Sequence, residues 1–293
     1  MKKGLTLLIA LLLFCLFIKT VSAQSHTPDK GKTNWEPRAK LVEIQSSLDG
    51  SMQKAYFYDS KSKKKKPLII GLHSWSTDYQ YKPDIEYLNE SIDRDWVMIH
   101  PDYRGPNTTI DAGGSKKVIQ DILDARDFAI KNANIDLSKI YLAGVSGGGH
   151  AALLMLANKP KKFDKVIAWV PITNLRKWYK WIKSSRPDLQ YADNIEVLCG
   201  GNPLTNKTAR LNCKKRSSIF KLRQNMKPDV HILPVIHYSH SSWTVPINHS
   251  ISAYNKLVEK DFRVTKKERK MLLNKKVPKS ELNGYLFDKT LYT

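Results

Sequence analysis

The chain has 293 residues, enough for one large domain with a single hydrophobic core. Its 49 lysines and arginines outnumber 27 acidic residues and give a net charge of +22, yet the sequence shows no interleaved basic and aromatic module of the kind that binds nucleic acid. The lack of such a module argues against a nucleic-acid partner. The basic runs favour either solvated loops and helix ends or attraction to an anionic polysaccharide, an envelope lipid or an acidic substrate.

The first 23 residues have the features of a secretory signal peptide. Two lysines precede an apolar run at 5–18, and a small-x-small site ends at Ala23. The run has 14 residues, fewer than the roughly 18 or more that span a bilayer. We therefore expect cleavage after Ala23, a single mature domain of residues 24–293, a periplasmic or extracellular location, and no stable membrane anchor after cleavage.

Strand and helix patterns alternate along most of the mature chain. Two strands joined by the Asp49-Gly50 turn are expected to form an edge hairpin, and continuous apolar runs indicate buried strands of a parallel sheet. The predicted strands are 41–46, 53–58, 67–73, 96–100, 165–170 and 230–236, and the predicted helices are 115–132, 245–258 and 257–274. This order predicts an α/β fold with a mostly parallel, doubly wound sheet and helices on both faces.

A further strand, turn and helix surround Ser146. The apolar run 139–145 leads into Gly144-Val-Ser-Gly-Gly148, and strong helix formers follow at 151–157. Glycine two residues to either side of a serine permits a turn so sharp that its hydroxyl is exposed above the sheet, beside the amides that open the next helix. The context predicts that Ser146 is a catalytic nucleophile; the alternative is a structural turn serine.

A serine nucleophile of this kind needs backbone donors for the oxyanion that forms during acyl transfer. The amide of Gly147, the residue after the nucleophile, is the first candidate. The second is expected from the loop after strand 67–73, as the amide of Ser74 or of Trp75. His73 is expected to pack or to form hydrogen bonds near the end of that strand.

The segment 173–200 is predicted to form a small cap over the strand ends. It contains Trp178 and Trp181, which are candidates to line a substrate pocket or, alternatively, to clamp the cap to the core. After signal cleavage the chain keeps Cys199 and Cys213, and an even pair in an exported chain predicts a disulfide, with two free thiols as the alternative.

The sequence predicts neither a cofactor nor a metal site. It contains no dinucleotide or phosphate-loop fingerprint, and its histidines, cysteines and acidic residues lack metal-ligand spacing. The expected partner is a small-molecule, glycan-ester or peptide substrate.

Several motifs in order resemble those of a secreted α/β-hydrolase of the prolyl-oligopeptidase-like group, which includes acetyl-xylan-esterase-like enzymes. They are Leu72-His-Ser-Trp-Ser76, His100-Pro-Asp-Tyr-Arg-Gly-Pro106, Gly144-Val-Ser-Gly-Gly-Gly-His150, Trp169-Val-Pro-Ile172 and Val245-Pro-Ile-Asn-His-Ser250. The resemblance covers roughly residues 38–290. It implies the α/β-hydrolase fold, Ser146 as nucleophile, and acyl transfer to water from an ester or an amide.

The acid and the base of the family depart from the usual pattern. Tyr238 stands where relatives carry the aspartate, and the alternative acid position falls near Asn174. No histidine follows His249, and the last strand, whose turn would carry the base, is expected to be missing. His237 and His240 follow strand 230–236 and are candidate bases for a Ser–His dyad, or polar residues that bridge loop backbone.

These observations leave three hypotheses. The first is an exported serine hydrolase that cleaves an ester or peptide bond through Ser146, with activity impaired by the missing acid and base. The second is a non-catalytic pseudo-hydrolase that binds a glycan or another ligand. The third is a truncated gene product with an exposed sheet edge.

Overall fold

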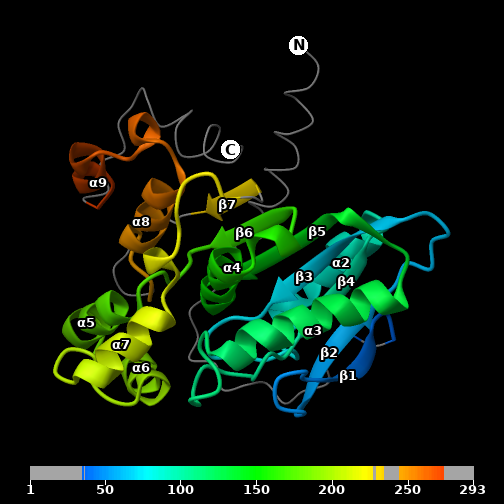
Figure 1. Ribbon diagram of the computed structural model, residues 1–293, viewed down its shortest axis with the longest axis horizontal. Helices are drawn as coiled ribbons and strands as arrows, with labels where there is room; N and C mark the ends of the chain where they lie inside the picture. The colour runs from blue at the N-terminus through cyan, green and yellow to red at the C-terminus, as the bar shows by residue number, and fades with distance from the viewer. Residues whose placement is uncertain (1–34, 36, 227–228, 234–243, 274–293) are drawn as a thin grey trace.

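The computed structural model describes residues 35, 37–226, 229–233 and 244–273, and these form one seven-stranded sheet (Figure 1). The strands are β1 (Lys40–Gln45), β2 (Met52–Tyr58), β3 (Lys66–Leu72), β4 (Val97–Pro101), β5 (Ile135–Val145), β6 (Lys165–Trp169) and β7 (Asp229–Leu233). Their order is β1-β2-β4-β3-β5-β6-β7. The pairs β1–β2 and β2–β4 are antiparallel and the other four are parallel, so the predicted hairpin and the mostly parallel sheet are confirmed.

Helices connect the strands and cover both faces of the sheet. They are α2 (Glu86–Asp93), α3 (Lys116–Asn132), α4 (Gly147–Asn158), α5 (Leu175–Ser185), α6 (Tyr191–Cys199), α7 (Lys207–Lys215), α8 (Asn248–Leu257) and α9 (Lys266–Leu273). Figure 1 shows α5, α6 and α7 as a group beyond the end of β6, in the place predicted for a cap. Within the described ranges, no helix is long and apolar enough to cross a membrane.

Alternate side chains of the central strands serve two separate cores. Leu68 and Ile70 of β3 belong to the larger core, which α3 and α4 complete. Ile69, between them, joins a smaller core with Leu88 of α2 on the opposite face. Because successive side chains of a strand point to opposite faces, the continuous apolar sequence of β3 is the consequence of helices on both sides.

The single helix predicted for 257–274 is wrong. The chain leaves α8 at Leu257, makes a short 3-10 turn at Lys260–Phe262 and restarts as α9. Side-chain bonds fix the break: Asn255 Oδ1 accepts from the Val264 amide at 2.9 Å, and Thr265 and Glu268 exchange bonds with each other's amides. That reciprocal pair is a capping box, which begins a new helix.

Strand β7 pairs with β6 on one side only, among the residues that the structure describes. The predicted loss of a further strand concerns 274–293, which lie outside these residues. An apolar pocket of about 250 Å³ lies beside β7, lined by Val230 and Ile232 of the strand and by Tyr254 and Leu257 of α8.

Candidate active site

Ser146 occupies a strained turn between β5 and α4. Its backbone has φ 55° and ψ −110°, a conformation that residues other than glycine rarely adopt. The Ser146 amide donates to the Trp169 carbonyl oxygen at 2.7 Å, so the end of β6 holds the turn in place. Val170, the next residue, also has a positive φ of 47°, an unusual geometry for a β-branched side chain. Strain of this kind persists only where the surrounding structure imposes it.

The glycines after Ser146 allow α4 to touch the loop that follows β3. A Cβ atom on Gly147 would lie 2.3 Å from the Trp75 amide nitrogen, and one on Gly148 would lie 2.2 Å from the Leu72 carbonyl oxygen. Both distances are far below van der Waals contact. The backbone of the helix start and the backbone of the loop therefore lie against each other, beside Ser146.

Two amides meet at this contact. Gly147 is the first residue of α4, where an amide has no acceptor within its own helix. The Trp75 amide hydrogen has no acceptor among the described residues. Of the two alternatives predicted for the second donor, Trp75 is the one whose amide nitrogen contacts Gly147, while the Ser74 hydroxyl donates to the Val145 carbonyl at 3.2 Å.

Asn107 holds the loop from the other side. Its side-chain nitrogen and its own amide donate to the Trp75 carbonyl oxygen at 3.1 and 2.9 Å, and its side-chain oxygen accepts from the Gly113 amide at 2.6 Å. Only 4% of Asn107 is exposed. Nothing in the sequence pointed to this residue beyond its place in a loop after a strand, because its partners lie far away in the chain.

The histidines that the structure places near the turn are bound to backbone. His150 Nδ1 donates to the Ile172 carbonyl at 2.8 Å, and burial lowers the pKa of His150 to about 4. His249 Nδ1 accepts from the Thr173 amide at 3.0 Å, and burial lowers the pKa of His249 to about 3. Both imidazoles are neutral at pH 7 and fix the segment that follows β6.

The proton-accepting side of the site is not described. The Ser146 hydroxyl has no hydrogen-bond partner among the described residues, and the two candidate bases, His237 and His240, lie outside them. Asn174, near one expected acid position, caps α5 by accepting from the Lys177 amide at 3.1 Å.

Trp178 packs in the interior and does not line a pocket. It is 1% exposed, stacks on Tyr191 and meets the Trp75 ring edge-on at 4.8 Å. Its Nε1 donates to the Thr244 carbonyl. Trp181 is half-buried against the same cluster. Of the two alternatives predicted for Trp178, its buried contacts fit that of clamping the segment to the core.

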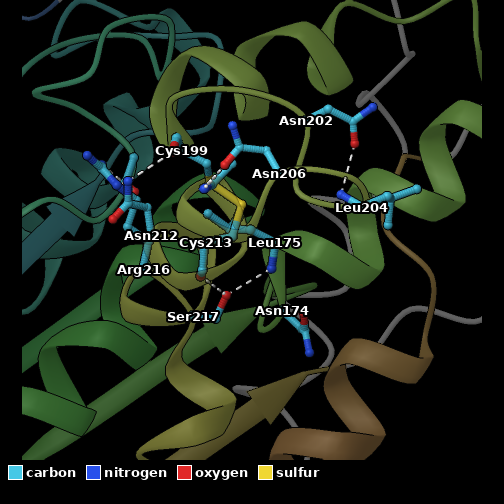
Figure 2. The surroundings of a disulfide bond; sticks show 12 residues. Asn174, Leu175, Cys199, Asn202, Leu204, Asn206, Asn212, Cys213, Arg216 and Ser217 are labelled. Atoms are coloured by element: carbon cyan, nitrogen blue, oxygen red, sulfur yellow. Dashed lines mark hydrogen bonds between the residues drawn. A yellow bond between two sulfur atoms is a disulfide. The ribbon is translucent and has the colours of Figure 1, made fainter.

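The predicted disulfide between Cys199 and Cys213 is present and ties α6 to α7 (Figure 2). Both residues are fully buried, with Cα atoms 5.3 Å apart. Asn212 donates to the Cys199 carbonyl at 3.0 Å. Ser217 donates to the Cys213 carbonyl at 2.6 Å and accepts from the Leu175 amide at 3.0 Å, so the bridge is joined to the start of α5.

Arg216 extends this connection to the oxyanion loop. Its guanidinium donates to the carbonyl oxygens of Ile110 at 2.6 Å, Ala112 at 2.5 Å and Gly113 at 3.2 Å. Gly113 in turn donates to Asn107. The sequence analysis did not single out Arg216, because its partners lie more than 100 positions away in the chain.

In the described part of the chain, no group of three or more histidine, cysteine or acidic side chains could hold a metal ion. Among these residues, the turn at Ser146 places a serine hydroxyl beside the backbone amides of Gly147 and Trp75.

Residues 86–273 match the model of the prolyl oligopeptidase family. The chain belongs to this family. Comparison with curated proteins gave no match. Among solved structures, the chain resembles the uncomplexed acylaminoacyl peptidase of Pyrococcus horikoshii at 19% identity and a TM-score of 0.58, over 75% of this chain and 34% of that chain.

Two further structures have the same fold. An acylaminoacyl peptidase in complex with Z-Gly-Gly-Phe-chloromethyl ketone is 21% identical, with a TM-score of 0.59, over 75% of this chain and 34% of that one. Oligopeptidase B from Leishmania major is 16% identical, with a TM-score of 0.58, over 75% and 31%. The chain thus spans about a third of the length of these family members. The resemblance to a prolyl-oligopeptidase-like α/β-hydrolase is confirmed.

Proposed function

We propose that this chain is an exported serine hydrolase in which Ser146 attacks the carbonyl carbon of an ester or peptide bond. The observation that carries the proposal is the strained turn of Ser146 placed directly beside the amides of Gly147 and Trp75. A hydroxyl held at such a turn needs no further movement to face a bound carbonyl group.

In the proposed reaction the Ser146 oxygen forms a bond to the carbonyl carbon, and the carbonyl oxygen takes up the negative charge. The amides of Gly147 and Trp75 donate to that oxygen, and the loss of one such donor costs about 3 kcal/mol of transition-state stabilisation. The leaving alcohol or amine departs to give an acyl-serine, which water then hydrolyses. His240 or His237 is proposed to take the Ser146 proton and to pass it to the departing alcohol oxygen or amine nitrogen.

Export is supported by two independent features. The leader has basic residues, a short apolar run and a small-x-small site ending at Ala23. The Cys199–Cys213 disulfide is of the kind that persists in oxidising compartments. A peptide or ester substrate is proposed from family membership, since the acylaminoacyl peptidase cited above binds a peptidyl chloromethyl ketone.

A fluorophosphonate probe tests the proposal, because it reacts with activated serine hydroxyls. We expect labelling of the wild-type chain, loss of labelling in Ser146→Ala, and no change in Ser185→Ala, which alters an exposed serine of α5. His240→Ala and His237→Ala, made separately, identify the base by the larger fall in rate. A cooperatively folded wild-type chain that takes up no probe would overturn the proposal and favour a non-catalytic binding protein.

A further inference from the structure

His73 lies at the end of β3, immediately before the oxyanion loop, and is fully buried. Its Nδ1 is 2.9 Å from the Ser74 carbonyl oxygen, and its Nε2 is 2.7 Å from the Asp102 carbonyl oxygen. A carbonyl oxygen can only accept a hydrogen bond, so each ring nitrogen must carry a proton to make these contacts. A neutral imidazole has one proton and would turn a bare nitrogen lone pair toward one of the two oxygens.

The surroundings of His73 suit a positive charge. The ring stacks on Tyr103, with centroids 4.0 Å apart and planes 12° from parallel, so the face of the tyrosine ring, which attracts cations, covers the imidazole. Burial raises the pKa of the Asp102 carboxyl, and its electrostatic interaction with His73 opposes that rise. The Tyr103 hydroxyl donates to the His73 carbonyl at 2.6 Å and so fixes the two rings together.

Other charged groups near this cluster do not compete for the proton. His100 meets the His73 ring edge-on at 6.5 Å, and burial, with the charge of His73, lowers the pKa of His100 to about 3. Asp84, 3.5 Å from His100, has its pKa raised well above the usual value by burial. Asp78 and Lys54 act on the Asp102 carboxyl with opposite signs.

The Ser74 carbonyl and the Trp75 amide are two ends of one planar peptide group. A hydrogen bond to the carbonyl end from a charged donor polarises the whole group and makes its N–H a stronger donor. We propose that His73 is a buried imidazolium that strengthens the Trp75 amide as an oxyanion donor, through the Ser74 carbonyl. The catalytic role given to His73 rests on the proposed function, whereas its positive charge does not depend on that function. His73 is then a positioning residue, because it acts on substrate only through Trp75.

Nuclear magnetic resonance of the full chain, labelled with ¹⁵N at its eight histidines, tests the charge directly. At pH 7 we expect both ring nitrogens of His73 to have protonated shifts, and each to couple to its own slowly exchanging proton. His73→Gln assigns the signals by their loss, and if that variant does not fold, ring-to-backbone correlations assign them in the wild type. A His73 ring with one unprotonated nitrogen at pH 7 would overturn the inference.

The effect on the loop is measured separately. In His73→Gln we expect the Trp75 amide proton to move upfield and the rate of fluorophosphonate labelling to fall about tenfold. The control is His231→Gln in β7, which should change neither quantity. An unchanged Trp75 shift in a folded His73→Gln chain would refute the polarisation. If the wild type takes up no probe, the proposed hydrolase activity fails, while the two resonance measurements still decide the state of His73.

Discussion

Replacing Asn107 with alanine should both destabilise the fold and weaken the oxyanion loop. The substitution leaves the buried Gly113 amide without its acceptor and removes one of the two donors to the Trp75 carbonyl. An unsatisfied buried amide costs about 1–3 kcal/mol, and the lost second bond adds roughly 1 kcal/mol. We therefore expect the free energy of unfolding to fall by about 3 kcal/mol.

Urea unfolding followed by far-ultraviolet circular dichroism measures this change, with Asn132→Ala as the matched control. Asn132 is exposed and donates to the Phe128 carbonyl at 2.8 Å within its own helix, so its loss should cost less than about 0.5 kcal/mol. Asn107→Asp separates the two bonds, because a carboxylate still accepts from Gly113 but cannot donate to Trp75.

In folded Asn107→Ala, the fluorophosphonate labelling rate of Ser146 should fall about tenfold or more, since the Trp75 amide is no longer held against Gly147. Asn107→Asp should show the same loss of labelling and at least as large a loss of stability, because it buries a negative carboxylate oxygen against the Trp75 carbonyl oxygen. Equal stability of Asn107→Ala and Asn132→Ala would refute the reasoning, because it would mean that the Gly113 amide finds another partner at no cost.

Three further outcomes follow from the same geometry. Replacing both Cys199 and Cys213 with serine should lower the free energy of unfolding by about 3 kcal/mol, because the disulfide closes a loop with a sequence separation of 14. Chemical reduction of the wild-type disulfide should lower the thermal melting temperature by the same amount as the double substitution. Gly148→Ala should destabilise the chain by about 3 kcal/mol or abolish soluble expression, whereas Gly200→Ala, with no heavy atom within 3.9 Å of the added carbon, should cost only about 1 kcal/mol for its positive φ. The buried His249 has a pKa below its value in the unfolded chain, so its contribution to stability is complete above about pH 6.5 and is lost on acidification. Between pH 7 and 5 this histidine alone should account for about 2 kcal/mol, in addition to the losses from the buried His100 and His150. The fall in the free energy of unfolding between the two pH values, measured in denaturation curves, should be smaller in His249→Asn than in the wild type.

The parts of the fold that follow from sequence are those with a strong local pattern. Strands β3 and β4 are continuous apolar runs because both sheet faces are covered, and their positions matched the prediction within one residue. Helix α3 begins after Ser115, the first residue of the predicted helix 115–132, and the Ser115 hydroxyl caps it by accepting from the Val118 amide. The sharp turn at Ser146 was predicted because such a turn needs glycine two residues to either side.

Helical periodicity alone failed beyond α8. The apolar and basic spacing of 257–274 suits one helix, but the Asn255 side chain binds Val264 and stops the helix from continuing. The Thr265-x-x-Glu268 capping box was present in the sequence and marks the restart, so this error was avoidable.

Contacts between distant segments could not be read from the sequence. Asn107 bonds to Trp75 across 32 positions, and Arg216 bonds to Gly113 across 103. Nothing in the local composition distinguishes such residues from solvated ones. Trp178 is the reverse case, because an aromatic residue in a basic segment left both a pocket and a packing role open. In the structure its indole N–H donates to the Thr244 carbonyl and its ring packs against buried apolar side chains.

The donor side of the site is therefore built from three supports that surround the Trp75 amide. His73 bonds to the carbonyl of the Ser74–Trp75 peptide, Asn107 fixes the next carbonyl, and Gly147 approaches the amide between them. Because this geometry belongs to main-chain atoms, substitution of the Trp75 side chain alone cannot remove the donor, whereas a shift of the backbone can. That is why the informative perturbations are those of the residues around the loop.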